Sequence, residues 1–326
     1  MKISKLTLMI FIACILLVIP FASAGELDGN QTMSLDDENP LEINDDSIYV
    51  DDFEGNDLND GKSQDTSVKS ISRALDLPNN NNTIFISSGN YTSDLNTKIT
   101  ISKSVNLVGC ENTIFDGQNR DYLFTITDNC KVTFKNIKFI NFYKVPSDEE
   151  SVYGAVLDIK NASVDIENCT FADNLVGHNA KSAVYGGAIS SFGNLTITDS
   201  VFINNTVNSA QGLNAAGGAI YNRGNLTIRN SSVLNSRSGI FSMGAGIANY
   251  AKLAIEDSEI AGSHISAESR GSAVYNAGEF TLTNSIIRNN VIEKSGIGNL
   301  YGAIYNSGNF TAVGNIFQNN AGVSES

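Results

Sequence analysis

Acidic side chains at repeating positions are the residues of this 326-residue chain whose types and spacing suit chemistry. Carboxylates on neighbouring coils of a repeat can bind Ca²⁺ beside a basic residue, as polysaccharide lyases require, or form the acid pair about 6.5–9.5 Å apart of inverting glycoside hydrolases. The acids at such positions are Asp165, Glu167, Asp173, Asp199, Glu256 and Asp257. Adjacent copies place Asn or Thr at the matching positions. We therefore expect no catalytic residue and no enzymatic activity, with a polysaccharide-cleaving enzyme as the alternative.

Basic residues and histidines do not supply the missing catalytic group. Arg223 and Arg229 lie on one predicted coil, near Lys252 on the next, without the surrounding acids that catalysis requires. His178 and His264 lie in different variable segments, where solvated side chains are expected.

A second acidic group precedes the repeats and consists of Asp51, Asp52, Glu54, Asp57 and Asp60. Carboxylates are preferred Ca²⁺ ligands, but the spacing does not follow the D-x-[DN]-x-[DN]-G pattern of an EF-hand. We expect a solvated acidic turn, with a calcium-stabilised cap as the alternative and no other cofactor.

The N-terminus has the layout of a secretory signal peptide over residues 1–24. Two lysines precede an apolar run that is short for a bilayer span, and Ala22-Ser23-Ala24 is a small-residue cleavage site. We expect a secreted or cell-surface protein without a membrane span after cleavage; an uncleaved anchor is the alternative. Residues 25–47 form an acidic lead-in that we expect to be disordered. The net charge of −14 argues against nucleic acid and anionic membranes as partners.

Three cysteines follow the predicted signal peptide, at Cys110, Cys130 and Cys169. An odd number excludes a closed disulfide framework, and no C-x-x-C or Cys/His spacing indicates zinc. We expect small buried residues and no metal site.

One helix is predicted before the repeats, in residues 48–82, after a strand that begins at Ile48. Asp65 or Thr66 can cap its start, and Pro78 ends it. Its apolar face is formed by Val68, Ile71, Ala74 and Leu75. Such a helix would cover the open end of a stack of strands, where unpaired edges promote aggregation.

The remaining chain, 83–326, repeats three short phrases. A Gly-Ala-aliphatic phrase recurs at intervals of 27–33 residues, beginning at Gly154, Gly187, Gly218, Ala245, Ser272 and Gly302. An alternating strand such as Leu226-Thr227-Ile228 follows, and then an aromatic or aliphatic residue three positions before Asn or Ser. A short period without a helix predicts a solenoid whose neighbours share one core. We predict an all-β fold, a right-handed parallel β-helix of about eight to nine three-strand coils with one N-terminal capping helix.

Two side-chain columns fit this interpretation. The first is an asparagine ladder of Asn222, Asn249, Asn276 and Asn306, whose amides can bond to the neighbouring coil. The second is a broken tyrosine column of Tyr221, Tyr275 and Tyr305, for which we expect stacking rather than recognition.

Five variable segments separate the repeat copies: 175–185, 206–216, 237–243, 264–270 and 291–301. Because the register repeats, we expect all five to leave the same side of the coils as loops, where recognition usually occurs. The predicted ligand-binding residues are His178, Asn179, Lys181, Gln211, Asn214, Phe241, His264, Arg270, Glu293 and Lys294.

Several motifs also carry a family resemblance. Gly186-Gly187-Ala188-Ile189 with Phe202-Ile203-Asn204-Asn205 resembles the repeats of polymorphic outer-membrane proteins. Together with "IFDGQ" at 114–118 and "TIFISSGNY" at 83–91, the chain resembles the adhesin-like proteins of methanogenic archaea. The resemblance implies a pectin-lyase-like fold, cell-surface display, and host or microbial glycans or surface proteins as partners. We therefore expect an exported binding protein; a structural rod that associates end to end is a further alternative.

Overall fold

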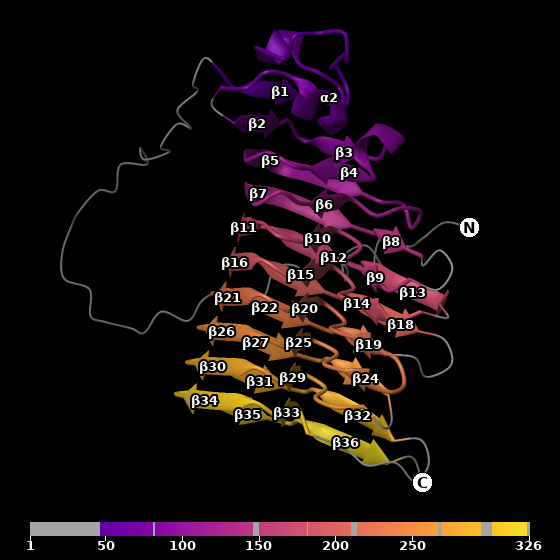
Figure 1. Ribbon diagram of the computed structural model, residues 1–326, viewed down its shortest axis with the longest axis vertical. Coiled ribbons are helices and arrows are strands. Elements are labelled where there is room, and N and C mark those ends of the chain that lie inside the picture. The colour runs from indigo at the N-terminus through magenta and orange to yellow at the C-terminus, as the bar shows by residue number, and fades with distance from the viewer. Residues whose placement is uncertain are drawn as a thin grey trace, which may run out of the picture. The chain divides into compact units, whose positions relative to one another are not determined.

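The computed structural model describes residues 46–80, 82–145, 150–180, 182–209, 214–266, 269–294 and 302–324. In these ranges the chain forms parallel strands stacked coil upon coil, which confirms the predicted all-β parallel β-helix (Figure 1). The predicted signal peptide and the lead-in up to residue 45 lie outside the described residues. None of the helices in the described ranges is long and apolar enough to cross a membrane.

Four sheets line the stack within these ranges. Sheet A contains β1 (Ile48–Val50), β2 (Thr83–Ile86), β3 (Gly89–Tyr91), β5 (Val105–Asp116), β7 (Lys131–Ile140), β11 (Ser163–Glu167), β12 (Thr170–Ala172), β16 (Asn194–Thr198), β17 (Val201–Ile203), β21 (Asn225–Arg229), β22 (Ser232–Leu234), β26 (Lys252–Glu256), β27 (Glu259–Ala261), β30 (Glu279–Thr283), β31 (Ile286–Arg288), β34 (Asn309–Val313) and β35 (Ile316–Gln318). Sheet B contains β4 (Ile99–Ile101), β6 (Phe124–Ile126), β10 (Leu157–Ile159), β15 (Ile189–Ser191), β20 (Ile220–Asn222), β25 (Ile247–Asn249), β29 (Val274–Asn276) and β33 (Ile304–Asn306).

The other two sheets have fewer strands. Sheet C contains β8 (Tyr143–Lys144), β13 (Leu175–Ala180), β18 (Thr206–Ser209), β23 (Arg237–Ser238), β28 (His264–Ile265), β32 (Val291–Lys294) and β36 (Ala321–Ser324). Sheet D contains β9 (Val152–Tyr153), β14 (Val184–Tyr185), β19 (Ala215–Ala216) and β24 (Ser242–Met243).

The three-strand coil predicted from the sequence is wrong. A central coil starts in sheet B, supplies two strands to sheet A, and then adds one strand each to sheets C and D. The segments expected to be loops therefore begin and, in most coils, end as strands. Sheet C is held in place because Val207 and Ile265 are buried while their neighbours along the strand are more exposed, and Val176 is buried at the matching position. Pairing also satisfies backbone groups that a buried loop would leave without partners.

The core consists of apolar residues repeated at one register. Leu195, Leu226 and Leu253 are paired residues of three successive sheet-A strands, and each is 1% exposed. Phe171 and Phe202 occupy the next column with ring centroids 4.6 Å apart. Alternate residues point outward, as a period of two requires.

The first glycine of the repeated G-G-A-I phrase makes the corner between sheets D and B. Gly186 and Gly217 have φ values of 68° and 70°, in the left-handed region. A Cβ on Gly186 would lie 2.1 Å from the backbone oxygen of Ile189. This position therefore requires glycine.

A capping helix covers the N-terminal end, but it is shorter than predicted. It is α2 (Ile71–Asp76), and Ser70, rather than Asp65 or Thr66, caps its start by accepting from Arg73 N. Val68 lies before the helix and forms a bridge with Val50 of β1. The 3₁₀ turns η1 (Gln64–Thr66) and η2 (Asp94–Asn96) flank α2.

Candidate functional site

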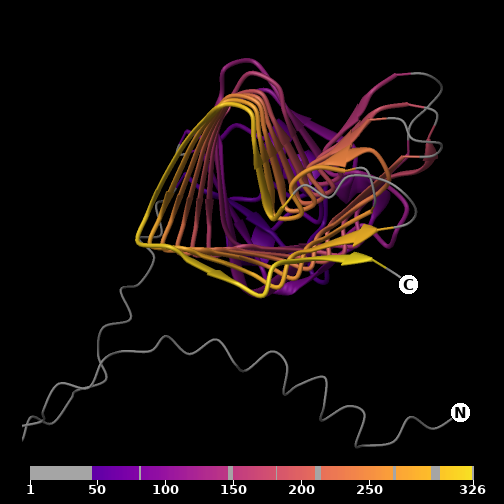
Figure 2. The ribbon, with the colours of Figure 1, turned by 90° about the horizontal axis from the view of Figure 1, so that it is seen from below.

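A corner between sheets D and B brings three columns of outward side chains together. Figure 2, a view along the stack, shows this corner as the inward bend of each coil, where the strands of sheet D meet those of sheet B. Sheet D supplies Tyr153, Tyr185, Ala216, Met243 and, through a bridge, Arg270. The middle residues of the sheet-B strands β10, β15, β20, β25, β29 and β33 form the second column: Asp158, Ser190, Tyr221, Ala248, Tyr275 and Tyr305. The positions that follow the sheet-B strands hold Lys160, Phe192, Arg223, Tyr250, Ala277 and Ser307.

The aromatic rings of these columns form a continuous row, which we call the aromatic face. Its members are Tyr153, Tyr185, Phe192, Tyr221, Tyr250, Tyr275 and Tyr305. Successive tyrosine centroids are 5.1, 4.6, 5.5, 5.4 and 5.4 Å apart. Tyr250 comes from a neighbouring column and fills the gap that Ala248 leaves between Tyr221 and Tyr275. The tyrosine column expected to be broken is therefore continuous in space.

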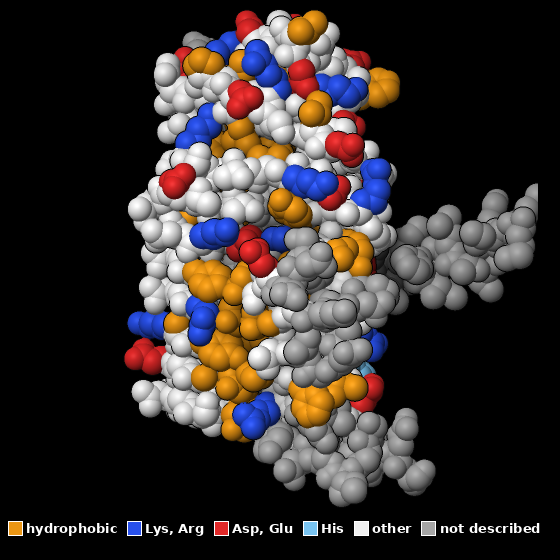
Figure 3. All heavy atoms as spheres, turned by 45° about the vertical axis from the view of Figure 1, so that its right-hand side comes forward, with side chains coloured by type: hydrophobic (Ala, Val, Ile, Leu, Met, Phe, Trp, Pro, Cys, Tyr) orange, Lys and Arg blue, Asp and Glu red, His pale blue; other side chains and the backbone are white. Residues whose placement is uncertain are grey.

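The rings of the aromatic face pack against one another along the coil axis, some stacked and some tilted. The angle between neighbouring rings varies: the planes of Tyr275 and Tyr305 are only 3° apart, whereas those of Tyr221 and Tyr250 differ by 52°. Tyr221 is buried, whereas Tyr185 and Tyr250 are half-buried. Burial raises the pKa of all three of these phenols, so they are protonated at neutral pH. Figure 3 shows hydrophobic side chains gathered on this side of the protein, with basic side chains among them.

Two arginines lie over this row. The guanidinium carbon of Arg223 is 5.5 Å from the centroid of Tyr250, and that of Arg270 is 5.2 Å from the centroid of Tyr305. Both distances fall within the range of cation–π attraction. The aromatic face therefore combines apolar rings, phenol donors and positioned cations.

A buried ion pair lies at the N-terminal end of the same face. Lys144 Nζ is 3.7 Å from Asp158 Oδ2, and the two side chains are 16% and 7% exposed. Lys144 also donates to the backbone oxygen of Tyr153 at 2.6 Å, and Ser190 donates to Asp158 at 3.1 Å. Burial lowers the pKa of Lys144 and raises the pKa of Asp158, because each charged form loses water.

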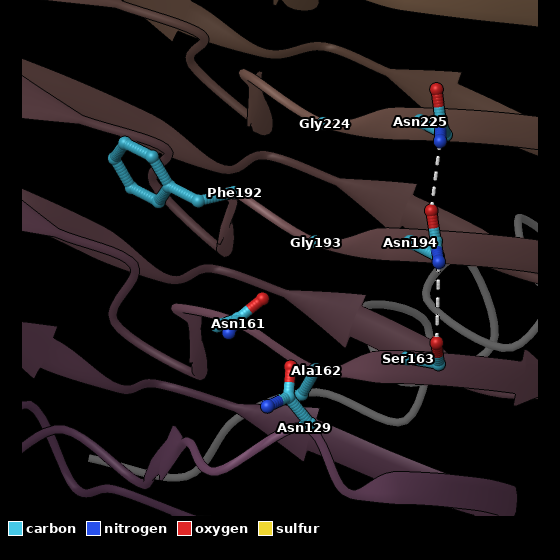
Figure 4. A pocket seen from close by; sticks show the side chains of 9 residues that line it. All are labelled: Asn129, Asn161, Ala162, Ser163, Phe192, Gly193, Asn194, Gly224 and Asn225. Atoms are coloured by element: carbon cyan, nitrogen blue, oxygen red, sulfur yellow. Dashed lines mark hydrogen bonds between the residues drawn. The ribbon is translucent and has the colours of Figure 1, made fainter.

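A hollow of about 240 Å³ borders the aromatic face at the turn from sheet B to sheet A. Gly193 and Gly224 line its floor, and Phe192 lies on one side of it (Figure 4). On the other side Asn225 donates to Asn194 at 2.8 Å, and Asn194 donates to Ser163 at 3.3 Å. We call these three side chains the amide row. Glycine is required here, because a Cβ on Gly193 would lie 2.0 Å from the backbone oxygen of Ala162 in the neighbouring coil.

The ligand-binding residues predicted from the sequence lie at different places in the structure. Arg270 lies on the aromatic face. His264 and Glu293 lie on the exposed side of sheet C, with Nδ1 and Oε1 3.3 Å apart, beside a hollow of about 250 Å³. Phe241 and Asn214 are exposed outside both places. The remaining predicted side chains fall outside the described part of the chain, and they are His178, Asn179, Lys181, Gln211 and Lys294.

The asparagines predicted as a ladder form one in the structure. Asn222, Asn249 and Asn276 each donate to the next, ending at Asn306, with distances of 2.7, 2.6 and 2.6 Å. Asn222 also accepts from Gly224 N at 3.1 Å and donates to Lys252 O at 2.9 Å. These bonds use the amide groups within the scaffold rather than for a ligand.

The acids at repeat positions hold neighbouring coils together. Lys131 pairs with Asp165 at 3.1 Å, and Lys135 pairs with Glu167 at 2.8 Å. Arg229 pairs with Glu256 of the next coil at 2.8 Å. Three other acids occupy left-handed turn positions, with φ values of 57°, 51° and 47° at Asp173, Asp199 and Asp257, and Asp173 also accepts from Asn204 of the next coil at 3.0 Å. Asn and Asp tolerate this left-handed backbone.

The acidic group near the N-terminus bonds to its own backbone. Asp51 accepts from Phe53 N and Glu54 N, and Asp57 accepts from Lys69 N and Ser70 N. Within the described ranges, no group of three potential metal ligands is close enough to hold an ion.

The cysteines differ in their surroundings. Cys130 and Cys169 are buried and free, and burial raises the pKa of Cys169 to about 12. Cys110 is exposed, so the prediction of three buried cysteines is wrong for this residue.

Comparison with known proteins adds remote similarities. No protein-family model matches the chain, and no curated protein matches it in sequence. A GH136 lacto-N-biosidase from Eubacterium ramulus is similar in structure, with 10% identity, 84% of this chain and 68% of that chain covered, and a TM-score of 0.35. Pectate lyase Pel9A has 16% identity, coverage of 86% and 78%, and a TM-score of 0.38. A rhamnogalacturonan lyase has 12% identity, coverage of 81% and 86%, and a TM-score of 0.30. Sequence identities and TM-scores this low give no information about the activity of this chain.

Proposed function

We propose that the protein is exported to the cell surface and binds a polysaccharide along the aromatic face and the amide row. The observation that carries the proposal is the aromatic face itself, a row of rings outside the main core, of which Tyr221 and Tyr275 are buried and the other five are half-buried. Contiguous apolar surface rimmed by polar groups is typical of interaction sites.

The chemistry of this surface suits a sugar polymer. Sugar rings have apolar C–H faces and polar rims, and Phe192 and the amide row supply both kinds of contact across one hollow. Tyrosine hydroxyls and asparagine amides can donate to and accept from hydroxyl groups. Because equivalent positions recur at the strand spacing of about 4.8 Å, the site repeats along its length as a polymer does. The resemblance to adhesin-like proteins also supports surface display and glycan recognition.

Affinity electrophoresis against a polysaccharide panel tests the proposal. We expect at least one polymer to retard the protein without being cleaved. The Phe192→Ala/Asn194→Ala variant, which changes both sides of the hollow, should lose at least about tenfold in affinity. Phe85→Ala is the matched control, because Phe85 is also a half-buried ring, stacked on Tyr49 at 5.6 Å on sheet A. Wild-type binding by the folded double variant would contradict the proposal.

A further variant distinguishes ligand binding on the aromatic face from ligand binding by the variable segments between repeat copies. Phe241 is 47% exposed in the turn between β23 and β24. Phe241→Ser should leave binding unchanged if the ligand lies on the aromatic face. Loss of binding in this variant alone would assign recognition to that turn.

One observation favours a second function, cleavage of the bound polymer. Lys144 and Asp158 place an amine of lowered pKa beside a carboxyl of raised pKa at the end of the aromatic face. Perturbed pairs of this kind occur at catalytic sites and also in structural ion pairs. Release of oligosaccharides by the wild type but not by folded Lys144→Met would establish this function.

A further inference from the structure

We infer that the ligand of the aromatic face is an anionic polysaccharide, bound through carboxylate or sulfate groups by cations on alternate coils. This inference rests on the proposed function and specifies its ligand class. It is carried by the positions of Lys160, Arg223 and Arg270.

The three columns around the corner carry a charge opposite to that of the whole protein. Their cations are Lys160, Arg223 and Arg270, and the one carboxylate among their described residues, Asp158, is paired with Lys144. The chain as a whole has a net charge of −14. A positive strip on an acidic protein attracts anionic ligands locally while the remaining surface repels them.

The cations also have a regular spacing. Lys160 follows β10, Arg223 follows β20, and Arg270 lies at the coil of β29. Because β10, β15, β20, β25 and β29 pair in that order, the cations occupy every second coil. Two coils correspond to about 10 Å along the stack. A polymer lying along the face can therefore place successive anionic groups opposite them.

The arginines are positioned to receive such groups. Arg223 lies against the ring of Tyr250 and Arg270 against Tyr305, which restricts each guanidinium before a ligand arrives. Among the described residues neither Lys160 nor Arg223 forms an ion pair, and both are exposed. Guanidinium groups bind carboxylate and sulfate oxygens with paired, charge-assisted bonds.

A second hollow, nearer the C-terminal coils, is lined by one basic and one acidic side chain, whose charges cancel. Lys252 and Glu279 are paired residues of β26 and β30, and both line the next hollow. The selectivity for anions should therefore depend on the three columns rather than on the amide row.

The test compares neutral and anionic polymers that share a backbone. Immobilised mannan with polymannuronate, hydroxyethylcellulose with carboxymethylcellulose, and dextran with dextran sulfate would be probed by biolayer interferometry with the full mature protein. We expect at least one anionic polymer to bind about tenfold or more tightly than its neutral partner, and this preference to weaken as salt rises from about 50 to 200 mM. The first two pairs report carboxylate recognition and the third reports sulfate recognition.

Variants that remove positive charges provide the second part of the test. Lys160→Gln/Arg223→Gln should remove the preference for anionic polymers, with an unchanged melting temperature. Arg229→Gln/Arg288→Gln is the matched control and should keep the preference, because it also removes two positive charges but from sheet A, where the arginines pair with Glu256 and Glu259. An equal effect of both variants would overturn the inference, since net charge alone would then explain the binding.

Other outcomes separate the inference from the proposed function. Equal affinity for neutral and anionic partners would overturn the inference and leave the proposed function standing. Binding of poly-L-glutamate as tightly as the best polysaccharide would overturn the polysaccharide assignment. Absence of binding to every polymer, or a concentration-dependent dimer that Phe192→Ala disrupts, would overturn both.

Discussion

Lys144 Nζ lies 3.7 Å from the carboxylate of Asp158, and both groups are almost withdrawn from water. Removing one partner leaves a buried charge uncompensated, so Lys144→Met or Asp158→Asn should each lower the free energy of unfolding by about 3 kcal/mol. The double variant should cost less than either single change, because no charge is then left buried. Urea denaturation measures all three. Additive costs in the double variant would show that the pair is not coupled.

The same pair gives stability a definite dependence on pH. Burial raises the pKa of Asp158, so the folded protein keeps this proton at pH values where the unfolded chain has released it. The resulting stabilisation is complete at low pH and is lost as pH rises from about 4 through the raised pKa. We expect the unfolding free energy of the wild type, relative to the Lys144→Met/Asp158→Asn variant, to fall across this window. A difference that stays constant between about pH 4 and 7 would argue against the raised pKa.

The asparagine ladder should be most sensitive at its centre. Asn249 donates to Asn276 at 2.6 Å and accepts from Asn222 at 2.7 Å, and it is fully buried. Asn249→Ala leaves buried partners on both sides and should cost about 3 kcal/mol or more. Asn306 is exposed at the end of the described ladder, so Asn306→Ala should cost less than about 1 kcal/mol. Comparable losses in the two variants, measured by chemical denaturation, would contradict the ladder's role.

Two buried serines of one coil test the value of a hydroxyl bond. Ser231 Oγ accepts from Ser200 N at 3.0 Å and donates to Arg229 O at 2.6 Å. Ser236 Oγ is buried without a hydrogen-bond partner among the described residues. Ser231→Ala should cost about 1–3 kcal/mol, whereas Ser236→Ala should be close to neutral. Thermal melts of the two variants provide the comparison, and the reverse order would refute it.

The sequence alone predicted those features in which one residue type recurs at the same position of successive repeats. Leu226 recurs as Leu253 in the next copy, and Asn222 recurs as Asn249, so a single column of the repeat reveals both the core and the ladder. The strands of sheet D, such as β24, have two residues each, too few to show an alternating pattern. The strands of sheet C vary from two to six residues between coils, so no common pattern marks them as strands in the sequence.

The aromatic face depends on several repeat positions at once. Tyr185, Tyr221 and Tyr250 occupy three different positions of the repeat, and only the glycine corner brings their rings together. A signal was present, because aromatic residues recur beside the G-G-A-I phrase, but reading one column at a time separates them. Lys144 and Asp158 belong to different sheets, so their pairing follows from the coil path rather than from spacing.

The glycine corner supports the last prediction. Gly217 has a φ of 70°, and a Cβ there would lie 2.2 Å from the backbone oxygen of Ile220. Gly217→Ala should therefore cost at least about 2 kcal/mol, since both the left-handed backbone and the contact are unfavourable. Gly239 is the matched control, because the nearest atom to its Cβ position is Asn208 Oδ1 at 3.4 Å.

Gly239→Ala should be neutral or slightly stabilising, because alanine restricts the unfolded chain. The corner also sets the angle at which Tyr185 meets Tyr221, so Gly217→Ala should weaken polysaccharide binding more than Gly239→Ala does. Melting temperatures and affinity electrophoresis of the two variants measure stability and binding separately. If Gly217→Ala loses stability but binds as the wild type does at a temperature where it is folded, the corner is a structural requirement only.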